Sequence, residues 1–311
     1  MQDRGLLFLT GGSGMVGRNI REHPSSRHWL ILAPDSGSLD LTAKDAVDEY
    51  MTAHRPSVVI HAAGRVGGIQ ANVASPVAFL EENMAMGHNV ITAARRAGVR
   101  RLLNLGSTCM YPRAAENPLR EEMILTGPLE PTNEGYALAK IMAMRLCEYI
   151  RREDPTAYYK TLIPCNLYGL HDKFDQRNSH LVAAIIDKIH TAKCNQAKTV
   201  EIWGDGTAKR EFMFASDLAD AVWRAVETIE ALPGEMNVGL GHDRSINDYY
   251  TTVAEVVGWQ GNFTHDLDKP VGMTRKLCST ERQCAWGWQA TTTLRDGIAQ
   301  TYRHYLQRHA T

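Results

Sequence analysis

The chain has 311 residues, of which 44% are hydrophobic and 22% charged, and its formal net charge at pH 7 is −1. A chain of this length and apolar content can bury a large core, either in one elaborate α/β domain or in two lobes. The near-zero net charge argues against general binding to nucleic acid or to a membrane, so any phosphate site has to be local.

The amino-terminal run Leu6–Thr10 is apolar, as a buried parallel strand requires, and a glycine-rich stretch follows it at once. Glycines there permit a tight turn and let backbone N–H groups approach a pyrophosphate at the start of a helix. Taken alone, such a stretch fits an ordinary tight turn equally well. Its place after a strand, together with a Tyr-Lys pair further along, favours a dinucleotide-binding loop. The loop comprises Gly11, Gly12, Ser13, Gly14, Met15, Val16 and Gly17.

The following segments alternate between strand and helix patterns. We expect strands at residues 29–33, 58–62 and 101–105, and helices at 43–54, 76–97 and 137–152. This alternation predicts an α/β fold with a Rossmann-type doubly wound parallel sheet, whose ligands bind at the carboxyl ends of the strands. Beyond residue 164 the alternation loosens, and residues 217–232 return as a helix. We therefore expect an NAD(P)-binding domain over 1–166 and 217–237, and a smaller C-terminal substrate-binding lobe over 167–216 and 238–311.

Tyr136 and Lys140 are four residues apart on a predicted helix, so they project from one face. We expect the ammonium to lower the pKa of the phenol and to prepare it for proton transfer. Ser107, after a predicted strand, would hold a carbonyl oxygen, which completes an apparatus for carbonyl reduction. Cys109 adds an acid–base group that simple reduction does not need. An arbitrary cysteine is more often a buried apolar filler, and both interpretations of Cys109 stand at this point.

Several segments resemble the extended short-chain dehydrogenase/reductase superfamily and, within it, the GDP-L-fucose synthase family. They span nearly the whole chain, at residues 67–72 (GGIQAN), 82–84 (ENM), 106–112 (GSTCMYP), 129–136 (LEPTNEGY), 164–169 (PCNLYG), 178–180 (NSH), 203–207 (WGDGT) and 210–212 (REF). The resemblance implies a GDP-linked 4-keto-deoxy sugar as substrate, epimerisation at C3 and C5, and NAD(P)H-dependent reduction at C4.

The resemblance also implies roles for individual residues. His180 would be the acid partner of Cys109, although a histidine at a helix start is more often a capping residue. The catalytic set would be Ser107, Cys109, Tyr136, Lys140 and His180. Substrate contacts would come from Ser107, Thr108, Cys109, Asn166, Lys188, Trp203, Arg210 and Lys276. Further cofactor contacts would come from Asp35, Ser36, Ala62, Ala63, Leu105, Gly106, Tyr136, Lys140, Pro164, Asn166, Leu167 and His180.

The cations of this set have an alternative interpretation as solvated surface charges. Trp203 offers a flat face for a base or sugar, and Arg210 with Lys276 can oppose a diphosphate, which favours a nucleotide-sugar site. Lys188 is the weakest member because helical lysines are common. His61 and His171 are expected to be structural.

The resemblance implies that family members using NADPH carry arginines shortly after the second strand, where they hold the 2′-phosphate. This chain departs from that pattern. This chain has Ala33-Pro34-Asp35-Ser36-Gly37-Ser38 instead. Asp35 could accept a hydrogen bond from a free ribose 2′-hydroxyl, which would favour NADH, whereas Ser36 and Ser38 could bind a phosphate. We expect NADP(H), with NAD(H) as the alternative.

The six cysteines are scattered and contain no Cys-x-x-Cys pair, which indicates reduced thiols in a cytoplasmic protein without a bound metal. The first apolar run is too short for a membrane span or a signal peptide. The resemblance implies a homodimer through the helices at 76–97 and 137–152. Its apolar contacts could come from Leu80, Met84, Ile91, Ile141 and Leu146, which could equally cover the sheet of a monomer.

Two other functions remain open at this point. A GDP-L-colitose synthase would epimerise only C5 of a 3,6-dideoxy-4-keto sugar and then reduce C4 with the same residues. A non-catalytic nucleotide-sensing protein of the same fold is a different class, and the complete set of Ser107, Tyr136 and Lys140 argues against it. A UDP-sugar 4-epimerase or a 4,6-dehydratase is disfavoured by Cys109.

Overall fold

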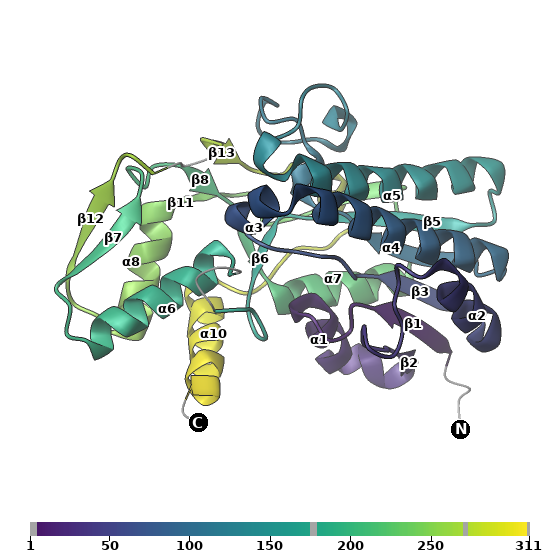
Figure 1. Ribbon diagram of the computed structural model, residues 1–311, viewed down its shortest axis with the longest axis horizontal. Helices are drawn as coiled ribbons and strands as arrows, with labels where there is room; N and C mark the ends of the chain where they lie inside the picture. Colours follow the sequence, from purple (N-terminus) through teal and green to yellow (C-terminus); the bar gives the residue numbers. More distant parts are fainter. Residues whose placement is uncertain (1–4, 175–178, 270–272, 310–311) are drawn as a thin grey trace.

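The computed structural model describes residues 5–174, 179–269 and 273–309. At its centre is a six-stranded parallel sheet with the strand order β10-β5-β4-β3-β1-β2 (Figure 1). The strands are β1 (Leu6–Thr10), β2 (Leu30–Leu32), β3 (Val58–His61), β4 (Arg101–Leu105), β5 (Tyr158–Pro164) and β10 (Glu235–Val238). The chain passes from β1 to β2 and then returns to β3 on the other side of β1. This reversal is the switch point at which open α/β sheets bind ligands, and it confirms the predicted Rossmann-type sheet.

Helices cover both faces of this sheet, because its strands are apolar on both sides. Leu7 and Leu9 face α1 (Met15–Glu22) and α7 (Ala215–Glu227). Phe8 and Val59 belong to the opposite core. The helices that supply this second core are α2 (Lys44–His54), α4 (Pro76–Arg96) and α5 (Glu134–Glu153), and Figure 1 shows α4 and α5 side by side.

Two helices differ from the sequence-based expectation by more than one residue. Helix α5 begins at Glu134 rather than at residue 137, because a 3₁₀ turn over Pro131–Asn133 leads directly into it. Tyr136 therefore lies in its first turn. Helix α7 spans 215–227 rather than 217–232, because the chain leaves the helix at Thr228 and continues as turns up to Ala231.

The second part of the molecule surrounds an aromatic-rich core that contains Tyr168, Tyr249 and Tyr305. Its sheets pair β6 with β9, β7 with β12, and β8 with both β11 and β13. The strands are β6 (Asn166–Tyr168), β7 (Thr199–Trp203), β8 (Lys209–Arg210), β9 (Phe212–Phe214), β11 (Arg244–Ser245), β12 (Asn262–Asp266) and β13 (Arg275–Lys276). The helices are α6 (Leu181–Cys194), α8 (Ile246–Val257) and α10 (Leu294–His309).

Short helices complete the chain. They are α3 (Ile69–Ala74), α9 (Glu281–Ala285), η1 (Pro24–His28), η2 (Thr108–Met110), η3 (Glu121–Met123) and η4 (Pro131–Asn133). Within the described ranges, no helix has both the length and the apolar character that crossing a membrane requires.

The segment around α9 packs on the large sheet rather than on the aromatic core. Cys278 and Trp288 are buried in the same cluster as Leu7, and the Trp288 indole donates to Asp220 of α7 at 2.7 Å. The division into 1–166 with 217–237 and 167–216 with 238–311 stays a prediction. Its second lobe includes this stretch that contacts the first.

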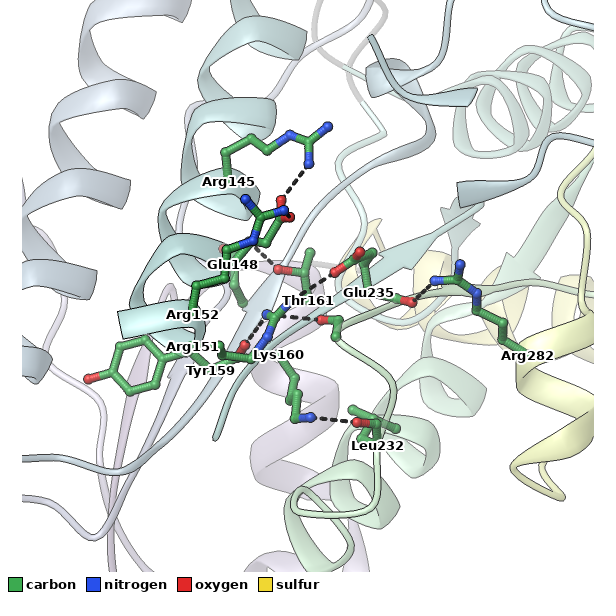
Figure 2. Close-up of polar contacts among 12 residues, drawn as sticks. Arg145, Glu148, Arg151, Arg152, Tyr159, Lys160, Thr161, Leu232, Glu235 and Arg282 are labelled. Carbon is green, nitrogen blue, oxygen red and sulfur yellow. Dashed lines mark hydrogen bonds and ion pairs between the residues drawn. The ribbon is translucent and has the colours of Figure 1, made fainter. Parts of the chain in front are cut away.

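The outer strand β10 is tied to α5 and α9 by polar contacts (Figure 2). The Arg151 guanidinium lies 3.1 Å from the Glu235 carboxylate and also donates to the Tyr159 carbonyl. On the other side, Arg282 donates to the Glu235 carbonyl at 2.8 Å. The buried Lys160 ammonium donates to the Leu232 carbonyl at 2.6 Å. Of these contacts, the bond from Arg282 occupies a backbone carbonyl of the edge strand β10, and the ion pair with Arg151 holds the Glu235 side chain.

Candidate active site

The turn between β1 and α1 forms a glycine cradle at the carboxyl end of the sheet. Gly11 has φ +71°, and a Cβ on it would lie 2.8 Å from the Ala63 backbone nitrogen. A Cβ on Gly17 would lie 2.1 Å from the Gly11 carbonyl oxygen. Only glycine fits these positions. Gly14 caps α1 without a side chain and no acidic residue follows in the first turn, so the helix N-terminus suits a pyrophosphate.

His61, at the end of β3, is a structural residue in this site. Its Nδ1 lies 2.9 Å from the Thr10 hydroxyl, which also accepts the Ala63 N–H at 3.2 Å. Burial lowers the pKa of His61 to about 3, so the ring is neutral. The pair fixes the backbone at Ala62 and Ala63, where the cofactor contacts are predicted.

Tyr136 and Lys140 project from the first turns of α5 toward the end of β4. Lys140 Nζ donates to the Leu105 carbonyl at 3.0 Å and lies 5.7 Å from the centroid of the Tyr136 ring. Burial lowers the pKa of Lys140 to about 8. Burial raises the pKa of Tyr136, Cys109 acts in the same direction, and a hydrogen bond with Ser107 opposes them. The expectation of a lowered phenol pKa is therefore wrong here, since burial outweighs the other influences.

Cys109 lies in the 3₁₀ turn η2, directly after β4. The Ser107 hydroxyl caps this turn by accepting the Cys109 backbone N–H at 3.3 Å. Cys109 Sγ accepts from Asn133 Nδ2 at 3.3 Å and lies 3.9 Å from Lys276 Nζ. Thr108, beside it, is only 2% exposed. Ser107, Cys109 and Tyr136 therefore meet as predicted, whereas the contacts of Cys109 with Asn133 and Lys276 were not expected.

His180 stands at the N-cap position of α6 with its side chain 38% exposed. Its ring Nδ1 lies 3.5 Å from the carboxylate of Asp172, which is 3% exposed. Sequence reasoning missed Asp172, because no local pattern links it to the histidine. The contact shown for His180 is with Asp172 rather than with Cys109, so its role as an acid remains a prediction. Asn178 of the predicted motif lies outside the described residues.

The predicted cations Arg210 and Lys276 are cross-strand neighbours. Arg210 of β8 is in register with Lys276 of β13, and on its other side with Arg244 of β11. Side chains at paired positions of adjacent strands share one face of a sheet, so the three cations form a row. Arg244 was missed, because nothing in its local sequence places it beside Arg210.

Two other predicted substrate residues lie at β7. Trp203, at the end of this strand, is 46% exposed, and the Lys269 ammonium lies 5.7 Å from its ring centroid. Lys188 of α6 donates to the Glu201 carbonyl of the same strand. Burial lowers the pKa of Lys188. Trp203 thus keeps an accessible ring, while Lys188 is engaged with the backbone two residues away.

Asp35 and Ser36 lie in an exposed turn after β2. Asp35 Oδ1 accepts from the Ser38 N–H at 2.9 Å and from the Ser38 hydroxyl at 2.8 Å. The Ser38 hydroxyl, together with the backbone, lowers the pKa of Asp35. Their contact with a cofactor ribose stays a prediction.

Pro164 ends β5, and Asn166 and Leu167 follow in β6 at the same edge of the sheet. Leu105 ends the neighbouring strand β4, and Gly106 comes directly after it. Asn166 Nδ2 donates to the Glu211 carbonyl at 3.0 Å. The Glu211 side chain, 1% exposed, accepts backbone N–H groups from Leu240, Gly241 and Cys278. Burial raises its pKa. Glu211 was noted in a sequence motif without a role. In the structure it connects the loop after β10 with the segment after β13.

Comparison with known protein families shows to which family the chain belongs. Residues 7–239 match the NAD dependent epimerase/dehydratase family. The chain belongs to this family.

Close relatives narrow the assignment. A GDP-L-colitose synthase from Yersinia pseudotuberculosis and a GDP-L-fucose synthase from Azorhizobium caulinodans are each 51% identical over 300 residues. These cover 96% of the chain and 97% and 96% of the two relatives. A solved GDP-mannoheptose C4 reductase from Campylobacter jejuni with NADP bound has a TM-score of 0.88 at 30% identity, covering 98% of this chain and 99% of the other. The resemblance to the GDP-L-fucose synthase family is confirmed.

Proposed function

We propose that the chain converts GDP-4-keto-6-deoxy-D-mannose to GDP-L-fucose, by epimerisation at C3 and C5 followed by NAD(P)H-dependent reduction at C4. The observation that carries this proposal is the meeting of two kinds of chemistry at one site. Tyr136 and Ser107, which suit a carbonyl oxygen, lie beside the Cys109 thiol, which carries hydrogen-bond donors of its own. The relative named GDP-L-fucose synthase, similar over nearly its whole length, supports it.

The epimerisation follows from the acidity of a 4-keto sugar. Removing a proton from C3 or C5 gives an enolate whose charge rests on the C4 oxygen, where Ser107 and Tyr136 can donate hydrogen bonds. Cys109 takes the proton, and His180, positioned by Asp172, returns one on the opposite face. Reprotonation precedes reduction, because reduction removes the carbonyl that makes these C–H bonds acidic.

The reduction uses the same phenol. A nicotinamide cofactor, when bound, supplies the hydride for C4. Tyr136 donates its proton to the C4 oxygen, and burial keeps that proton on the phenol by raising its pKa. With a pKa of about 8, Lys140 is mostly an ammonium at neutral pH and adds positive charge near the developing alkoxide. The Gly11–Gly17 cradle would hold the cofactor pyrophosphate, and the lack of room for a Cβ at Gly11 and Gly17 supports this.

We propose NADP(H) as the cofactor, with NAD(H) as the alternative. The similar reductase solved with NADP supports the first, and the Asp35 turn supports the second. The substrate diphosphate would bind the row of Arg210 and Lys276, and Trp203 would stack on the base or sugar. We place the protein in the cytoplasm, in keeping with its six free thiols.

GDP-L-colitose synthesis is the second candidate, because a relative of that name is equally identical to this chain. The two substrates differ in the hydroxyl at C3. The test is incubation with each of the two GDP-4-keto sugars and with NADPH or NADH in D₂O, followed by NMR of the product. GDP-L-fucose with deuterium at C3 and C5 is expected. Turnover of the 3,6-dideoxy sugar alone would favour colitose, and no cofactor oxidation with either would leave the nucleotide-sensing interpretation.

We also propose a homodimer through α4 and α5. The predicted contacts need revision, since Ile91 and Ile141 are 0% and 5% exposed and therefore serve the protomer core. Exposed apolar side chains of α3, α4 and α5 are better candidates. They are Met84 of the predicted contacts, together with Ile69, Val73, Val77, Leu138 and Tyr149. Light scattering is expected to give twice the chain mass, and a single-chain mass at micromolar concentration would contradict the proposal.

A further inference from the structure

Asn133 makes an unusual use of its side chain. It occupies the N-cap position of α5, where an asparagine oxygen ordinarily accepts a backbone N–H of the first turn. Among the described residues, its side chain makes no such bond. Its Nδ2 instead donates to Cys109 Sγ at 3.3 Å, across 24 residues of sequence. The asparagine thus gives up the usual capping bond in favour of a contact with the thiol.

The direction of this hydrogen bond matters for the chemistry. An amide NH₂ can only donate, so it binds the sulfur as an acceptor. The thiolate is the basic form of cysteine, and N–H donors bind an ionised acceptor more strongly than a neutral one. Lys276 Nζ lies 3.9 Å from the same sulfur, and the Cys109 backbone N–H is held by Ser107. The sulfur therefore has Asn133 and Lys276 as donors, and its backbone is fixed separately.

The amide oxygen of Asn133 makes no contact that would stabilise the fold among the described residues. Asn133 Oδ1 is buried and has no hydrogen-bond partner in the part of the chain that the structure describes. Asn133 also lines a pocket of about 180 Å³ that includes Asn72, Pro76 and Tyr136. Buried polar atoms are rarely left without a partner unless a site requires it. The amide therefore lies between the thiol and a pocket that borders the predicted proton donor.

We propose that Asn133 is a positioning residue for Cys109. It holds the sulfur where the thiolate can reach the C3 and C5 hydrogens, so it acts in proton exchange and not in hydride transfer. The inference rests on the proposed epimerase and reductase function. It assigns a role to a residue whose type and place in the sequence gave no sign of one.

Asn133→Asp is the decisive variant. Aspartate has the same size and is an equally good N-cap, but its carboxylate cannot donate to the sulfur and repels a thiolate. Asn133→Ser is a second variant, which keeps a good N-cap with a side chain too short to replace the amide. Asn195→Asp makes the same chemical change at an exposed site after α6 and serves as the control.

Two measurements test the proposal. In D₂O with the GDP-4-keto sugar, deuterium exchange at C3 and C5 should fall about 100-fold in both variants, as for a misplaced reacting group. The KM for the sugar and the binding of NADPH should change far less, whereas NADPH oxidation should fall with the exchange because reduction follows epimerisation. Separately, peptide mass spectrometry follows iodoacetamide labelling of Cys109, with exposed Cys194 and Cys284 as internal references. Labelling of Cys109 should slow in Asn133→Asp and stay unchanged in Asn195→Asp.

The outcomes separate this inference from the proposed function. If the unmodified protein exchanges deuterium and both variants exchange as fast, the positioning role is wrong. An equal loss of exchange and of NADPH binding would mean a merely structural role and would also overturn it. If the unmodified protein exchanges nothing with either keto sugar, the proposed function fails, while labelling of Cys109 still decides whether Asn133 controls the thiol.

Discussion

The backbone N–H of Cys278 donates to the buried carboxylate of Glu211 at 2.9 Å. The same carboxylate accepts the Gly241 N–H at 2.9 Å, so it joins the loop after β10 to the chain that follows β13. Lys276 stands two residues before Cys278. Glu211 therefore helps to set where Lys276 meets Cys109, although it lies in the core and touches neither.

Replacing Glu211 should destabilise the fold. In Glu211→Leu, the backbone N–H groups that it accepts lose their partner, and each costs about 1–3 kcal/mol when buried without a bond. Glu211→Gln should cost less, because the amide oxygen still accepts. Urea unfolding at pH 7 measures both. A free energy of unfolding for Glu211→Leu equal to that of the unmodified protein would contradict this account.

Cys109→Ser should separate the two reactions. Without the thiol, solvent deuterium incorporation at C3 and C5 should fall by roughly two to four orders of magnitude, as for the loss of a general base. Cofactor binding should persist, because the glycine cradle is untouched. NMR of the recovered sugar and fluorescence titration of the cofactor follow the two effects. Undiminished exchange would remove Cys109 from the mechanism.

Tyr136→Phe is the complementary change. The phenol that protonates the C4 oxygen disappears while the ring remains, so reduction should collapse and part of the epimerisation should survive. The measurement is NADPH oxidation beside deuterium exchange in the same sample. Near-normal NADPH oxidation would show that another group supplies the proton.

The pH dependence of reduction should reflect Lys140. Burial lowers its pKa to about 8, so the ammonium is present below that pH and is lost above it. Since kcat/KM reports on the free enzyme, kcat/KM for the cofactor should decline as pH rises through about 8. Tyr136 should not contribute to this limb, because its pKa is raised. A profile that is flat from pH 7 to 9 would refute the role of Lys140.

Cofactor choice should depend on the turn after β2. A 2′-phosphate bound at this turn would meet Asp35 instead of arginine, which should weaken its binding by ~1–3 kcal/mol, on the order of a charged hydrogen bond. The ratio of kcat/KM for NADPH over NADH should be near one, and Asp35→Ala or Ser36→Arg should raise it. Strong NADPH preference that neither substitution alters would mean that the phosphate is held elsewhere.

Features set by local spacing could be predicted from the sequence. The glycine loop follows its strand directly, and Tyr136 and Lys140 share a helix face because they are four residues apart. Ser107 and Cys109 directly follow a strand that lies beside β3 and β5 in the sheet. The alternation of apolar strand segments with helix segments likewise predicted most strands of the large sheet, which are buried on both faces.

Features that depend on tertiary closure could not be predicted. Asn133 reaches Cys109 across 24 positions, and Lys276 reaches it across 167. The raised pKa of Tyr136 has the same origin, because burial depends on the whole fold rather than on the neighbouring lysine. Ile91 and Ile141 were expected at the dimer interface but are buried within the protomer. Helix periodicity identifies an apolar face and cannot tell whether that face meets the core or a second protomer.

The register of β13 against β8 places Lys276 beside both the proposed diphosphate site and the Cys109 sulfur. Lys276 is paired with Arg210, the proposed anchor of the diphosphate, and its ammonium also approaches the sulfur of Cys109. A substitution of Lys276 would therefore change both the affinity for the substrate diphosphate and the ability of Cys109 to act as a base. Among the described residues, Arg244 and Trp203 are not hydrogen-bonded to the sulfur, so substitutions there should change substrate binding without changing the base.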